Sequence, residues 1–137
     1  MKQVIIDTDI LSYYMKGQSN VVENFDNHVN EFGFVFISRI TIIEILGGLK
    51  SKNADSQITK LKALIAKHKI LDTSEVSAEI SSNIFAQLQK VGRHSGNYDI
   101  LIAGITIANN LTLVTNNEKD YENIQDLEIA NWTLTVR

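Results

Sequence analysis

Short apolar runs and longer segments of helical spacing alternate along the chain. Runs rich in β-branched or aromatic residues predict strands over residues 4–6, 34–37, 70–71 and 111–114, with a short edge strand over 127–129. Apolar residues recur with the helical period over residues 10–16, 21–29, 39–50, 58–68, 74–91 and 99–109. Strands that alternate with helices favour an α/β fold with a central, mainly parallel sheet flanked by helices.

Two of the predicted helices should be buried in different ways. The segment 74–91 is amphipathic, and Thr73 or Ser74 is suited to cap its start. Its apolar face comprises Val76, Ile80, Ile84 and Leu88. The segment 100–108 is apolar nearly all round, which predicts a buried central helix.

The composition is that of an ordinary globular protein. With 137 residues the chain is long enough for one core but too short for two, so residues 1–137 are expected to form a single domain. The hydrophobic share of 44% and the charged share of 21% are close to the averages of soluble proteins. No apolar run approaches the ~20 residues of a membrane helix, and the N-terminus lacks the apolar segment of a signal peptide. These properties predict a cytoplasmic protein without a membrane partner.

Cysteine is absent, which excludes disulfides, thiolate nucleophiles and cysteine-based zinc sites. The histidines, His28, His68 and His94, are too scattered to suggest a cluster. Chemistry must therefore come from carboxylates, hydroxyls and amides. The net charge of -3 argues against binding nucleic acid by bulk electrostatics, but it leaves room for a local basic patch and bound cations.

Two acids stand where a functional site is expected. Asp7 directly follows the first strand, and ligands of such sheets bind beyond the carboxyl ends of the strands, although Asp7 or Thr8 could simply cap the next helix. Glu44 has no basic residue three or four positions away, and Gly47 and Gly48 leave open space beside it at a cost of about 1 kcal/mol each in helix propensity. A carboxylate in a partly apolar site usually binds a metal or changes its protonation, whereas an exposed glutamate at a helix end is the simpler alternative.

Two further acids follow the same pattern. Asp99 opens the most apolar helix, where it could also serve as a cap, and Asp120 follows the last strand by way of a polar TNN segment that is typical of a loop. All four acids fall at the carboxyl end of a strand or at the start of the next helix, which favours convergence in one cleft. Such carboxylates repel one another unless a divalent cation neutralises them, and oxygen ligands favour Mg²⁺ or Mn²⁺ over zinc. These ions typically assist phosphoryl chemistry.

Four stretches carry these acids in a specific order: IIDTDIL at the start, ISRITIIEILGGL in the first third, NYDILIAGIT later and LVTNNEKDYENIQDLEIANW near the end. In this ordered set the chain resembles the PIN-domain ribonucleases, and most closely the VapC-type toxins of bacterial and archaeal toxin-antitoxin pairs. The likeness covers essentially the whole chain. It implies that Asp7, Glu44 and Asp99 are the three core acidic metal ligands.

The resemblance also implies roles for residues around these three acids. Asp120 is expected to be the fourth acid, and Asn117 a polar contact to metal-bound water or substrate. Thr8 and Thr115 fall where the family places hydroxyls that orient the site. Asp9 stands where many relatives have asparagine, so no ligand role is assigned to it.

The activity implied by the resemblance is hydrolysis of RNA phosphodiester bonds by metal-bound water, without a covalent intermediate. Family toxins usually cut a tRNA or ribosomal RNA, are held inactive by a small antitoxin whose tail enters the active groove, and commonly form homodimers. Lys50, Lys52, Arg93 and His94 are candidate contacts to the RNA backbone, although plain surface charge is the simpler interpretation of each.

Two other functions remain open from the sequence. The DTD of the first motif is similar to the first motif of haloacid-dehalogenase-type phosphatases, but Leu11 stands where threonine or valine is usual and no paired acids follow the last strand. The second alternative is a PIN-like module that binds a partner and has lost catalysis. The joint presence of Asp7, Glu44, Asp99 and Asp120 argues against it, because an inactive site has no use for so much repulsion.

Overall fold

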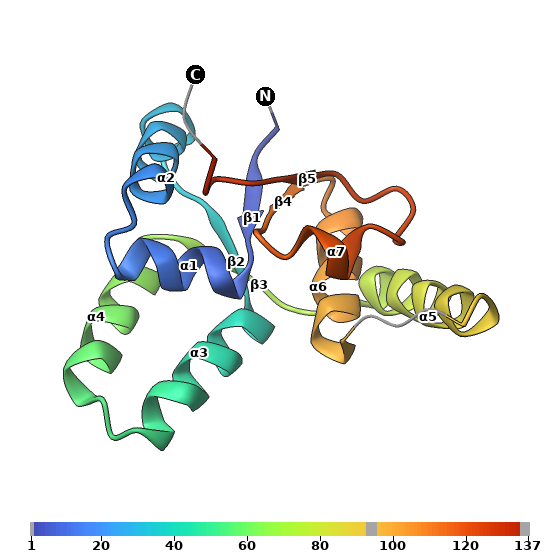
Figure 1. The fold of residues 1–137 in the computed structure, drawn as a ribbon, viewed down its shortest axis with the longest axis horizontal. Helices are drawn as coiled ribbons and strands as arrows, with labels where there is room; N and C mark the ends of the chain where they lie inside the picture. The colour runs from blue at the N-terminus through green and yellow to red at the C-terminus, as the bar shows by residue number, and fades with distance from the viewer. Residues whose placement is uncertain (1, 93–95, 135–137) are drawn as a thin grey trace.

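The computed structural model describes residues 2–92 and 96–134, and its centre is a five-stranded sheet in the order β3-β2-β1-β4-β5 (Figure 1). All neighbouring strands are parallel. In this spatial order the strands are β3 (Lys69–Leu71), β2 (Phe36–Ser38), β1 (Val4–Ile6), β4 (Thr112–Val114) and β5 (Ile129–Ala130). The carboxyl ends of parallel strands meet at one edge, so residues that follow β1, β2 and β4 are brought together.

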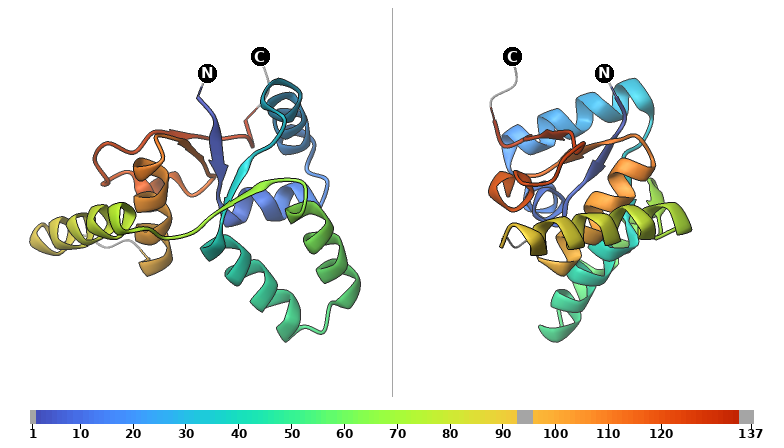
Figure 2. Two further views of the ribbon diagram at one scale, coloured as in Figure 1. Left: turned by 180° about the vertical axis from the view of Figure 1, so that it is seen from behind. Right: turned by 90° about the vertical axis from the view of Figure 1, so that its right-hand side faces the viewer.

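The helices cover both faces of this sheet. Figures 1 and 2 show α1 to α4 on one side and α5 to α7 on the other. Their bounds are α1 (Thr8–Met15), α2 (Ser19–Phe32), α3 (Arg39–Ser51), α4 (Asp55–Ile65), α5 (Glu75–Lys90), α6 (Asn97–Ala108) and α7 (Glu118–Tyr121). No helix in the described part of the chain is long and apolar enough to cross a membrane.

The alternation of side chains along β1 divides the core into two layers. Val4 and Ile6 pack with α1, α2, α3 and α4, whereas Ile5 packs with α6 and with Tyr121 of α7. All three β1 residues are buried, as expected for a central strand of a sheet covered on both faces. The predicted α/β fold with a central parallel sheet is confirmed.

Details of three helices differ from the expectations. Ser74 does cap α5 and forms a capping box with Ser77, but Val76 is 60% exposed, because α5 buries Ser77 and Ser81 against α6 instead. Helix α6 begins before Asp99 and has Gly96 at its cap position, so Asp99 is not a cap. The single turn α7 was not predicted, because four residues are too few to show a helical period.

Candidate active site

Asp7 lies at the centre of the candidate site, directly after β1, and is only 4% exposed. Its Oδ1 accepts from the backbone N of Thr8 at 2.8 Å, so it does cap α1. Its Oδ2 accepts from the Thr115 hydroxyl at 2.8 Å and lies 3.1 Å from the Tyr121 hydroxyl. Burial raises the pKa of Asp7, and these hydrogen bonds oppose that rise. A cap alone would need only the first of these contacts.

Glu44 accepts a hydrogen bond at the end of a row of hydroxyl groups that includes Thr8, the residue after Asp7. The Thr8 hydroxyl donates to Glu44 Oε1 at 2.7 Å and lies 3.2 Å from the hydroxyl of Thr41. The Ser38 hydroxyl lies 3.2 Å from Thr41 Oγ1 in turn. Each hydroxyl has one proton, and Thr8 gives its proton to Glu44. The hydrogen bonds are therefore donated in one direction, from Ser38 to Thr41, from Thr41 to Thr8 and from Thr8 to the carboxylate of Glu44. The alternative of a solvated glutamate at a helix end does not fit this half-buried, hydrogen-bonded position.

Asp99 reaches the same edge from the first turn of α6. Its Oδ1 lies 3.0 Å from the Tyr121 hydroxyl, which also contacts Asp7. Burial raises the pKa of Asp99, and the charges of Asp7, Asp120 and Glu44 raise it further, while the hydrogen bond from Tyr121 lowers it. The charges of the other three predicted acids therefore all act on Asp99.

The loop after β4 completes the surroundings of Asp7. Thr115 is fully buried, and its Oγ1 accepts from the backbone N of Asn117 at 3.0 Å. Asn117, directly before the one-turn helix α7, and Asp120, within it, are both exposed. The Asp120 charge raises the pKa of both Asp7 and Asp99. Thr115 thus orients Asp7 directly, and Asn117 acts on it through the backbone.

Asp9 takes a different place from the four acids. Its Oδ1 accepts from the backbone N of Ile10 at 2.7 Å, and its Oδ2 accepts from the backbone N of Asn116 at 2.9 Å. Burial and the nearby charge of Asp7 raise the pKa of Asp9 to about 6. Asp9 therefore ties the start of α1 to the loop after β4, which is a structural role.

The donor chemistry fits a divalent ion, although the acids are not gathered around one point. In residues 2–92 and 96–134 no three acidic or histidine side chains form a ready metal cluster. The carboxylates are joined through hydroxyl groups instead. The ion pairs of Lys2 with Glu128 and of Arg39 with Asp72 do not involve Asp7, Glu44 or Asp99. Oxygen donors such as these carboxylates suit Mg²⁺ or Mn²⁺.

Sequence reasoning missed Tyr121 and the buried hydroxyls of Ser38 and Thr41. Tyr121 is 2% exposed, yet its hydroxyl contacts two site acids. Its position directly after Asp120 was the only signal in the sequence. Among the candidate RNA contacts, Lys50 and Lys52 are exposed near the end of α3, and Arg93 and His94 lie outside the described residues.

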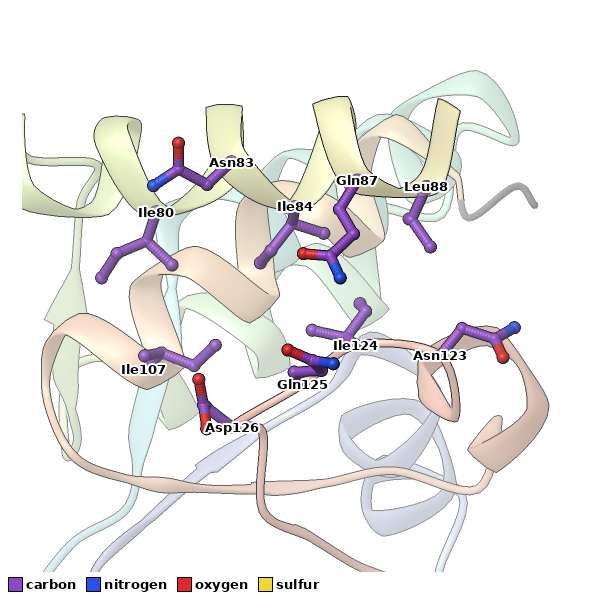
Figure 3. Close-up of a pocket in the computed structure, with 10 residues that line it drawn as sticks. All are labelled: Ile80, Asn83, Ile84, Gln87, Leu88, Ile107, Asn123, Ile124, Gln125 and Asp126. Carbon is purple, nitrogen blue, oxygen red and sulfur yellow. The ribbon is translucent and has the colours of Figure 1, made fainter. Parts of the chain in front are cut away.

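A hollow of about 220 Å³ lies elsewhere, between α5, α6 and the segment after α7 (Figure 3). Side chains from α5 point across it toward Ile107 and the segment 123–126. Its lining residues are Ile80, Asn83, Ile84, Gln87, Leu88, Ile107, Asn123, Ile124, Gln125 and Asp126. None of the four site acids is among them, so the hollow is separate from the candidate active site.

Comparison with known proteins gives consistent matches along nearly the whole chain. The model of the PIN domain family matches residues 4–127. The tRNA(fMet)-specific endonuclease VapC of Shigella flexneri is 28% identical over 135 residues, which cover 97% of this chain and 100% of the relative. Ribonuclease VapC2 of Rickettsia felis is 31% identical over 129 residues, or 93% of this chain and 96% of the relative.

A solved structure agrees with these matches. The structure of VapBC2 from Rickettsia felis bound to a DNA fragment from its promoter superimposes with a TM-score of 0.86 at 30% identity. The superposition covers 94% of this chain and 98% of the other. The chain therefore belongs to the PIN-domain family, in its VapC branch.

Proposed function

We propose that the chain is a metal-dependent endoribonuclease that hydrolyses RNA phosphodiester bonds in the cytoplasm and acts as the toxin of a toxin-antitoxin pair. The similar proteins of Shigella flexneri and Rickettsia felis bear the names of an endonuclease and a ribonuclease. The PIN-domain match over residues 4–127 argues against the alternative of a haloacid-dehalogenase-type phosphatase.

The observation that carries this proposal is the hydroxyl-linked set of acids at the carboxyl edge of the sheet. The Tyr121 hydroxyl contacts both Asp7 and Asp99, and Glu44 accepts a hydrogen bond from Thr8, the residue next to Asp7. Three acids from three separate elements would not be kept together for stability, because their charges repel. A site that binds a divalent cation explains the arrangement.

In the proposed mechanism the side chains of the protein hold the metal ion and fix one another's orientation. Asp7, Glu44 and Asp99 would hold Mg²⁺ or Mn²⁺, with Asp120 adding negative charge from α7. The bound ion would supply an activated water and offset charge on the phosphate. Thr8 and Thr115 fix the rotamers of Glu44 and Asp7 through their hydroxyl donors.

The substrate and partners follow from the same comparisons. The name of the Shigella flexneri relative specifies tRNA(fMet), so a tRNA is the first substrate to test, with ribosomal RNA as the second. The Rickettsia felis structure is named VapBC2, which supports a cognate antitoxin as the partner of this chain. We also propose a homodimer, which light scattering at micromolar concentration would check.

The test is cleavage of tRNA by the purified full chain with Mg²⁺, with Mn²⁺ and with EDTA. We expect cleavage only with a metal ion and loss of cleavage in Glu44→Gln and Asp99→Asn. Asp55→Asn, which changes an exposed acid in the first turn of α4, is the matched control and should cleave like the wild type. Cleavage that survives EDTA would contradict the proposal, and binding of an antitoxin without any cleavage would support a non-catalytic module instead.

A further inference from the structure

Tyr121 is anchored by the core, and only its hydroxyl reaches the site. Its side chain packs in the layer that contains Ile5, Ile102 and Leu113, and the residue is 2% exposed. Its backbone O accepts from the N of Ile124 at 3.1 Å, which closes the turn that follows α7. A ring held in this way places its hydroxyl at a fixed point, unlike a side chain on an exposed loop.

The hydroxyl of Tyr121 lies between carboxylates from two different elements. It is 3.1 Å from Asp7 Oδ2, at the end of β1, and 3.0 Å from Asp99 Oδ1, in the first turn of α6. A phenol has one proton, so it cannot donate to both carboxylates at once. With both carboxyl groups ionised, only one contact can be a hydrogen bond at a time, and the other brings two oxygen atoms together without a proton between them.

A plain structural role does not account for this placement. A buried phenol needs one acceptor, and Asp7 alone would satisfy it. The second carboxylate adds repulsion that an ordinary core would avoid, whereas a cation shared by Asp7 and Asp99 would offset it. The Thr115 hydroxyl also donates to Asp7 Oδ2, so two hydroxyl groups contact this oxygen, whereas the hydrogen bond described for Oδ1 comes from the Thr8 backbone N.

We propose that Tyr121 is a positioning residue, whose hydroxyl sets the spacing and rotamers of Asp7 and Asp99 for one divalent ion. The inference rests on the proposed function, because it takes these two acids to be metal ligands. Groups that hydrogen-bond to metal-binding side chains typically change metal affinity or activity by about 10- to 100-fold when they are removed.

The test is Tyr121→Phe, which keeps the ring and removes only the hydroxyl. The matched control is Tyr14→Phe, because the Tyr14 hydroxyl also contacts a carboxylate, that of Asp26 at 3.4 Å, outside the site. Mn²⁺ affinity is measured by titration calorimetry, folding by thermal melts in EDTA, and tRNA cleavage as kcat and KM. For Tyr121→Phe we expect Mn²⁺ affinity and kcat to fall by about 10- to 100-fold, with KM for RNA and the EDTA melt close to wild type. Tyr14→Phe should match the wild type in Mn²⁺ affinity and kcat.

A Tyr121→Phe protein that binds Mn²⁺ as tightly as the wild type would overturn the inference. If that variant does not fold, wild-type protein labelled with ¹³C at tyrosine Cζ decides the matter. Addition of Mg²⁺ should then shift the Tyr121 resonance, assigned by elimination with Phe variants of Tyr13, Tyr14 and Tyr98, and an unmoved resonance at saturating Mg²⁺ would contradict the inference. A failure of the proposed function looks different, because the wild type itself would then neither bind Mn²⁺ nor cleave tRNA.

Discussion

Gly104 and Gly47 both lie within helices, but alanine should have opposite effects at the two positions. A Cβ at Gly104 of α6 would clash with Ser81 Oγ of α5 and would lie 2.8 Å from the backbone O of Ser77. A Cβ at Gly47 of α3 would meet nothing within 4 Å. The backbone of neither residue requires a positive φ, so packing and helix propensity decide the outcome.

The expected magnitudes follow from these contacts. Alanine gains about 1 kcal/mol over glycine in a helix interior, so Gly47→Ala should stabilise the protein by roughly that amount. Gly104→Ala has the same gain, but overpacking typically costs about 1 to 3 kcal/mol. Moving the Ser81 side chain away would also break its 3.0 Å hydrogen bond to the backbone O of Ile100, at a net cost of about 1 kcal/mol. Gly104→Ala should therefore be destabilised by about 1 to 3 kcal/mol overall.

Urea denaturation followed by far-UV circular dichroism measures both effects. The double variant Gly104→Ala/Ser81→Ala should recover part of the loss, because it removes the Oγ atom that the new Cβ meets, although the Ser77 carbonyl still lies close. A Gly104→Ala protein as stable as the wild type would refute the close packing of α5 on α6. A destabilised Gly47→Ala protein would refute the open surroundings of that glycine.

Two further predictions concern the site and a buried histidine. Thr8→Val should fold normally but cleave RNA about 10- to 100-fold more slowly, because it removes the hydroxyl that orients Glu44. The control Thr8→Ser keeps the hydroxyl and should retain more activity than Thr8→Val. His28→Leu should stabilise the protein, because His28 is 3% exposed and neither ring nitrogen has a hydrogen-bond partner among the described residues. Burial lowers the pKa of His28, and the charge of Glu31 opposes this shift to a smaller extent. Below about pH 6.5 the unfolded wild type therefore binds more protons than the folded form. The folded wild-type protein consequently loses stability as the pH falls. The advantage of His28→Leu in urea denaturation should therefore be larger at acidic than at neutral pH, and an advantage that does not change with pH would contradict a neutral buried imidazole.

Much of the fold could be predicted because its elements have clear periods. The runs in β1 and β4 are short and rich in β-branched and apolar residues, as expected for central parallel strands, and most of the apolar part of α6 is buried as predicted. The buried face of α5 could not be predicted in the same way. Small residues allow α5 to approach Gly104 closely, so Ser81 is buried while Val76 is exposed. Hydrophobicity alone favours the burial of valine, and it gives no information about where the backbones of two helices come close together.

The acids of the site were predicted from their places after strands and from the family resemblance, whereas the groups that connect them were not. Tyr121, Thr41 and Ser38 carry no charge, and a hydroxyl acts only through the distance and direction to its acceptor. Those depend on how α3, α6 and α7 pack against the sheet. Local sequence patterns hold no information of that kind.

The central claim is that Asp7 holds a catalytic metal ion rather than merely capping α1. Asp7→Asn separates the two roles, because asparagine keeps an oxygen for the Thr8 backbone N and caps about as well as aspartate, but it lacks the negative charge. The measurement is Mn²⁺- and Mg²⁺-dependent tRNA cleavage by the purified variant beside the wild type, with thermal melts in EDTA to verify folding. Our account predicts a folded protein without detectable cleavage, melting at or slightly above the wild-type temperature because repulsion with Asp99 is relieved. A folded Asp7→Asn protein that cleaves tRNA at the wild-type rate would contradict it.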